Sequence, residues 1–98
     1  MGASAKRFEI DLIQYQIIIL PAAEKSLANL PKKMQVRIQG AITTLASNPV
    51  PPVAKKLVGR DNYRLRVSDY RIIYSIHENI LTVKIVAVGH QRDVYRKK

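Results

Sequence analysis

Residues 63–76 read YRLRVSDYRIIYSI. Apolar and basic side chains alternate along residues 63–67, which is typical of a strand with one buried and one exposed face. Ser68-Asp69 can form a two-residue turn, although the signal is weaker than that of Asn-Gly. Because β-branched and aromatic residues follow over 70–76, the stretch predicts an antiparallel hairpin.

The turn also predicts the register of this hairpin. Counting outward from it places Arg66 opposite Arg71. The next pair on the same face is Arg64 with Ile73, so three guanidinium groups would rise from one face. The opposite face, which is expected to point toward the helices, would carry Tyr63, Leu65, Ile72 and Tyr74.

This concentration of arginine predicts an anion site. Like charges that face each other across strands cost a few tenths to about 1 kcal/mol, and a local rule broken in this way often marks a functional site. For one arginine, neutralisation by Asp69, Asp93 or Glu78, or solvation by water, would be the simpler explanation. Three on one face favour a site for phosphate, which a guanidinium binds through two parallel hydrogen bonds.

The N-terminal half predicts a strand followed by two helices. Residues 14–20, QYQIIIL, are rich in β-branched residues and end at Pro21, which suits the first turn of a helix. That helix covers 21–30, and Pro31 ends it or starts the next one. The second helix has an apolar face with helical spacing and stops at SNP; this face contains Met34, Ile38, Ala41, Ile42 and Leu45.

The remaining segments complete an α+β fold. Residues 48–59, NPVPPVAKKLVG, hold three of the five prolines and predict an extended connector. Residues 80–89, ILTVKIVAVG, are apolar at nearly every position and predict a strand in the middle of the sheet. We therefore expect a two-helix hairpin packed on a small, mainly antiparallel four-stranded sheet. Residues 14–98 would form a single domain, with residues 1–13 as a frayed N-terminal extension.

Composition narrows the functional classes. Seventeen Lys and Arg against seven Asp and Glu give a net charge of +10, which attracts polyanions such as nucleic acid. The chain has no cysteine, so a thiolate nucleophile or thiolate metal site is excluded. The longest apolar run, from Ile17 to Ala23, is far shorter than the ~20 residues of a membrane-spanning helix. We expect a cytoplasmic protein without a membrane partner.

The pattern of polar residues predicts chemistry without a metal or cofactor. The two histidines, His77 and His90, and the scattered carboxylates match no metal-ligand spacing, and the four glycines are isolated. RNA offers a suitable reaction, because its own 2′-hydroxyl can attack the adjacent phosphate. The protein then supplies positioning, positive charge and proton transfer.

The hairpin, taken together with residues 86–97, VAVGHQRDVYRK, resembles the RelE branch of the RelE/ParE toxin superfamily. The resemblance covers roughly residues 14–97. It implies an endoribonuclease that cuts mRNA in the ribosomal A site, without a metal, by attack of the 2′-hydroxyl. It also implies that the ribosome and mRNA are partners.

The resemblance assigns roles to individual residues. Arg64 and Arg66 match basic positions of the hairpin, Arg71 matches the arginine of DYRIIY, and Tyr95 matches the C-terminal tyrosine. The family often has arginine directly after Gly-His or Gly-Lys; here that position is Gln91 and Arg92 follows. Arg71 and Arg66 would bind the cleaved phosphate. The further candidates for catalysis or RNA binding are Arg92, His90, Lys55, Lys56 and Arg96.

Several assignments stay open at this point. The proton carrier could be Tyr95 or His90, whereas a packing role for Tyr95 and a strand-capping role for His90 are the structural alternatives. Lys55 and Lys56 could belong to a solvated loop. A ParE-like inhibitor of gyrase and a non-catalytic RNA-binding module are the competing functions. The charge predicts a cognate acidic antitoxin, through which alone the chain would contact operator DNA.

Overall fold

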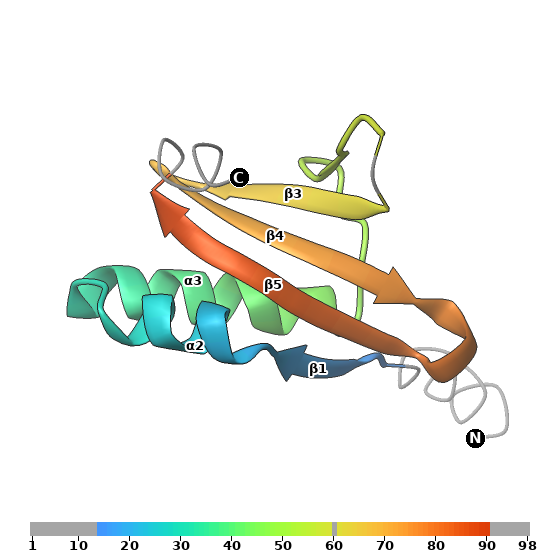
Figure 1. The fold of residues 1–98 in the computed structure, drawn as a ribbon, viewed down its shortest axis with the longest axis horizontal. Helices are drawn as coiled ribbons and strands as arrows, with labels where there is room; N and C mark the ends of the chain where they lie inside the picture. Colours follow the sequence, from blue (N-terminus) through green and yellow to red (C-terminus); the bar gives the residue numbers. More distant parts are fainter. Residues whose placement is uncertain (1–13, 60, 91–98) are drawn as a thin grey trace, which may run out of the picture.

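The computed structural model describes residues 14–59 and 61–90 (Figure 1). In chain order the elements are strand β1 (Gln16–Ile19), helices α2 (Pro21–Ala28) and α3 (Lys32–Leu45), strands β2 (Lys55–Lys56), β3 (Asn62–Val67) and β4 (Tyr70–His77), the 3₁₀ turn η1 (Glu78–Ile80) and strand β5 (Thr82–His90). None of these helices has the length and apolar character needed to cross a bilayer.

The strands form one sheet in the order β1-β5-β4-β3-β2. β1 pairs with β5 in parallel, and the other neighbours are antiparallel. Both helices cover the same face of this sheet, and the opposite face, which we call the open face, carries no helix among the described residues (Figure 1). The core between the layers contains Ala23, Leu27, Ile38, Ile42, Leu45, Leu65, Ile72, Tyr74, Val83, Ile85 and Val88.

The two predicted helices and their turn are confirmed. Pro21 occupies the first turn of α2, where its missing N–H costs nothing, and Pro31 precedes α3. The corner between the helices is held by Gln35, whose Nε2 donates to the carbonyl oxygens of Leu30 at 2.9 Å and Ala28 at 3.1 Å. These bonds satisfy carbonyl groups that the end of a helix leaves without intrahelical partners.

The predicted register of the hairpin is also confirmed. Arg66 lies opposite Arg71, and Arg64 lies opposite Ile73. Ser68, the first residue of the two-residue turn, has a φ of 57°, in the left-handed region. Such a positive φ is characteristic of tight hairpin turns, because it matches the twist of the two strands.

The predicted number of strands is wrong, because the sheet has five strands rather than four. The additional strand is β2, which lies in the segment expected to be an extended connector. Lys55 pairs with Arg64, and Lys56 pairs with Tyr63. A strand of two residues is too short to show a period of two, so its partner β3 defines it rather than its own sequence.

Tyr74 ties the proline-rich segment to the core. Its side chain is fully buried, and its hydroxyl donates a hydrogen bond of 2.7 Å to the carbonyl oxygen of Pro49. Its ring stacks on Tyr63 with 5.7 Å between centroids. Burial raises the pKa of Tyr74 to about 12, and the neighbouring Tyr63 phenol acts in the same direction.

This raised pKa predicts a loss of stability at alkaline pH. The folded phenol keeps its proton where the unfolded phenol, with a pKa of 10.0, has lost it. The free energy of unfolding of the wild type should therefore fall as pH rises from 10 to 12, with up to about 2–3 kcal/mol due to Tyr74. Tyr74→Phe should be less stable by about 1 kcal/mol at pH 7 but should show a shallower decline. Urea unfolding at several pH values measures both effects, and parallel curves for the two proteins would contradict the prediction.

Candidate functional site

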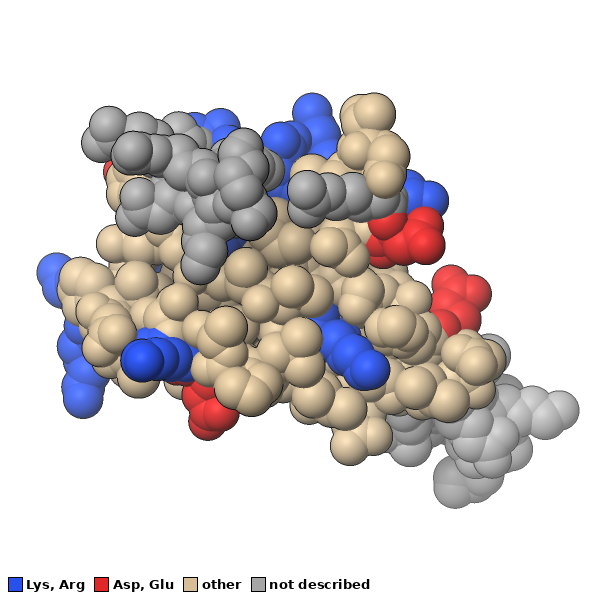
Figure 2. Space-filling model, viewed as in Figure 1, with Lys and Arg blue, Asp and Glu red and all other residues tan. Residues whose placement is uncertain are grey.

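A basic hollow lies on the open face of the sheet. It is lined by Val53, Lys55, Arg64, Arg66, Ser68 and Arg71 and has a volume of about 440 Å³. In Figure 2, basic side chains are visible at the upper rim of the molecule, above β3. The structure thus brings together all three arginines of the hairpin and adds a lysine from the neighbouring edge strand.

Strand pairing positions each of these cations. Lys55 on β2 lies opposite Arg64 on β3, so their side chains leave the sheet on the same face. Arg66 lies opposite Arg71, and its Nε donates a 3.4 Å hydrogen bond to the carbonyl oxygen of Ser68 in the turn. On its other side Arg71 lies opposite Gly89 of β5.

The electrostatic character of the hollow follows from this packing. Four cationic side chains line it, and three of them are guanidinium groups. The Nε and Nη1 atoms of Arg71 are buried, and Coulomb interactions with a group removed from water are less screened than those on the surface. A phosphate bound here would offset the repulsion between Arg66 and Arg71. The hollow is therefore built to attract an anion.

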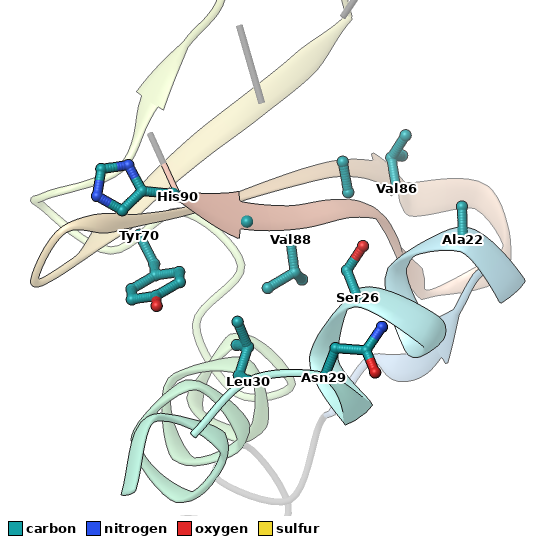
Figure 3. Close-up of a pocket in the computed structure, with 10 residues that line it drawn as sticks. Ala22, Ser26, Asn29, Leu30, Tyr70, Val86, Val88 and His90 are labelled. Atoms are coloured by element: carbon teal, nitrogen blue, oxygen red, sulfur yellow. The ribbon is translucent and has the colours of Figure 1, made fainter. Parts of the chain in front are cut away.

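Two other predicted site residues lie elsewhere. Lys56 lines a different hollow, of about 470 Å³, together with Asp61 and Tyr63. His90 lines a third hollow, of about 630 Å³, between α2 and β5 (Figure 3). Its ring meets that of Tyr70 edge to face with 5.6 Å between centroids. Neither Lys56 nor His90 is among the residues that line the basic hollow.

The remaining predicted residues, Arg92, Tyr95 and Arg96, lie outside the described residues, as does Gln91. Within residues 14–59 and 61–90, no three His, Asp or Glu side chains gather where they could hold a metal ion. Sequence reasoning missed Val53 and Ser68 as lining residues. Ser68 could have been found from its place in the turn, but Val53 carries no such local signal.

Comparison with known proteins assigns this architecture to a family. The family model of the ParE toxin of type II toxin–antitoxin systems matches residues 17–95. A RelE-like toxin protein of Escherichia coli is 31% identical over 87 residues, which is 85% of this chain and 92% of that protein. Toxin RelG of Mycobacterium tuberculosis is 28% identical over 87 residues, covering 85% of this chain and 98% of that protein.

Solved structures agree in fold. The toxin–antitoxin complex RelBE2 of Mycobacterium tuberculosis contains a chain with a TM-score of 0.73 and 25% identity, covering 80% of this chain and 99% of that one. The archaeal RelE–RelB complex of Pyrococcus horikoshii gives a TM-score of 0.71 and 32% identity, covering 79% of this chain and 94% of that one. The two helices over a mainly antiparallel sheet are thus shared with RelE proteins.

Proposed function

This chain belongs to the RelE/ParE superfamily of type II toxins, and from that premise we propose that it is a ribosome-dependent endoribonuclease that cleaves mRNA in the A site. The proposal rests mainly on the basic hollow of about 440 Å³, which Lys55 and the three hairpin arginines line and which is large enough to hold a phosphate group. Such a cluster suits a reaction whose transition state gains negative charge on phosphate oxygens.

The proposed reaction uses the RNA as its own nucleophile. The 2′-oxygen attacks the adjacent phosphorus as its proton passes to a base, and the bond from phosphorus to the 5′-oxygen breaks as that oxygen receives a proton. The products are a 2′,3′-cyclic phosphate and a 5′-hydroxyl end. DNA has no 2′-hydroxyl, so the reaction selects RNA.

The arginines divide the work in this proposal. Arg66 and Arg71 face each other and bind the nonbridging oxygens of the cleaved phosphate. Arg64 lies two residues further from the turn than Arg66. Together with Lys55, it binds the RNA backbone next to the cleaved phosphate. Tyr95 and His90 remain the candidates for proton transfer, and because His90 lines the hollow between α2 and β5, Tyr95 is the stronger of the two.

The proposal includes a cognate acidic antitoxin. The similar chains of Mycobacterium tuberculosis and Pyrococcus horikoshii were solved in toxin–antitoxin complexes. A net charge of +10 and a hollow lined by four cations favour a partner segment rich in carboxylates. We propose that such a segment folds along the surface, neutralises the arginines, and provides the chain's contact with operator DNA.

Mapping of mRNA ends tests the proposed activity. The purified protein is added to ribosomes that carry a message, and new 5′ ends are expected inside the A-site codon. Gyrase supercoiling is measured in parallel, because the matching family model is that of a ParE toxin. Intact message together with inhibited supercoiling would reject the endoribonuclease and favour the gyrase inhibitor.

A further inference from the structure

A fifth cation shares the open face with the basic hollow. Lys84 of β5 lies opposite Ser75 of β4, and Ser75 lies opposite Asn62 of β3. Two residues before Ser75, Ile73 lies opposite Arg64. Since every second residue of a strand points to the same face, Lys84 and Arg64 rise from the same side of the sheet.

The separation between these cations suits a polynucleotide. Lys84 is two strands away from Arg64 and displaced by two residues along them, so strand spacing and rise place their Cα atoms ~12 Å apart. Both side chains leave the sheet in the same direction, so their charged ends can stay apart. The two side chains can therefore bind different phosphates of one strand.

The residues that pair with Lys84 on the two neighbouring strands carry no negative charge. Its lateral neighbours are Ser75 on one side and Ile18 of β1 on the other, both uncharged. Two residues further along the strands, His77 of β4 pairs with Thr82 of β5. The Nε2 atom of His77 is hydrogen-bonded to the Ser75 hydroxyl at 3.0 Å. A phosphate beside Lys84 would thus meet polar groups directly, and the nearest hollow with carboxylates, that of Asp61 and Glu78, begins at Ser75 and His77.

Acidic residues limit the other route away from the arginines. The hollow at the far end of the β3-β4 hairpin is lined by both Asp61 and Glu78, and acidic side chains are visible at the right edge of Figure 2. An RNA strand that followed the hairpin to that end would meet these carboxylates. Crossing the strands toward β5 leads it to Lys84, whose neighbour Ser75 lies at the border of that acidic hollow.

We propose that single-stranded RNA crosses the open face of the sheet from the arginine hollow toward β5, and that Lys84 binds a backbone phosphate outside the cleaved linkage. This inference rests on the proposed function for its substrate but concerns binding rather than cleavage. The lysine supplies a point charge without base recognition, so the contact is independent of RNA sequence.

The salt dependence of RNA binding tests this proposal. The probe is an eight-nucleotide 2′-O-methyl oligonucleotide, which lacks the attacking hydroxyl and stays intact. Each phosphate contact contributes about 0.7 to the slope of log K against log salt for single strands. Lys84→Gln should therefore reduce the slope by ~0.7, whereas Lys84→Arg should retain it. The matched control Lys33→Gln removes an exposed lysine of α3, on the helix side, and should leave the slope unchanged.

A 2′-O-methyl dinucleotide provides the second control. It has one phosphodiester, so when the arginines bind that phosphate none is left for Lys84, and wild type and Lys84→Gln should bind it with the same slope. Equal slopes for the longer probe would overturn the proposal. A defect of Lys84→Gln on ribosomes without message, with none on the oligonucleotide, would also overturn it, because the contact would then be to ribosomal RNA. If the wild type does not cleave mRNA, the proposed function is rejected. The slopes still decide whether Lys84 binds an RNA phosphate, because they measure binding alone.

Discussion

Arg71→Ala is expected to lower mRNA cleavage on programmed ribosomes by about 10²–10³-fold, the usual effect of removing one preorganised donor to a developing negative charge. Its Nε and Nη1 atoms are buried, and it lies opposite Arg66 on one side and Gly89 on the other. Binding to the ribosome should change little, because many surface cations contribute to that association. Single-turnover cleavage and co-sedimentation with ribosomes measure the two quantities separately.

Two further variants make this experiment specific. Arg71→Lys keeps the charge but loses the planar, two-pronged donor, so it should restore only part of the activity. Arg37→Ala removes an exposed arginine of α3 and should cleave like the wild type. Equal losses of cleavage and ribosome binding in Arg71→Ala would instead identify the chain as a basic binding module without catalysis.

Ile85→Ala is expected to have the largest effect on stability. Ile85 is fully buried in β5, the strand that lies between β1 and β4, and it pairs with both Ile19 and Tyr74. Removing its side chain should leave a cavity between sheet and helices and lower the free energy of unfolding by about 2–5 kcal/mol. Chemical denaturation followed by circular dichroism measures this change.

Ile80→Ala is the matched control for this substitution. Ile80 belongs to the turn η1 just before β5, and 57% of its surface is exposed. The same chemical change should therefore cost less than about 1 kcal/mol. A similar loss in both variants would mean that β5 is not the centre of the core.

Much of the fold could be predicted from local patterns. The hairpin register followed from two features, the alternation of residues 63–67 and the two-residue turn at Ser68-Asp69, and it placed the three arginines on one face. Pro21 marked the start of the first helix, because it fits the first turn, and Pro31 marked the boundary between the two helices. The apolar residues at nearly every position of 80–89 indicated a strand with neighbours on both sides, as β5 has.

Other features had no local signal. β2 was missed because two residues show no periodicity. The pairing that brings Lys55 beside Arg64 was therefore missed as well. The place of His90 also had no local signal. The pairing of β5 with β4 aligns it with Tyr70, on the helix side of the sheet.

The chain's local sequence was sufficient to specify a basic hairpin, because turn length and a period of two link residues that are close in the chain. The composition of the site depended instead on contacts between distant segments. Lys55 and Lys84 join the open face through the pairing of β2 with β3 and of β5 with β4. Such pairings form when the sheet assembles on its helices, since burial of the shared core selects them, and no short stretch of sequence encodes them.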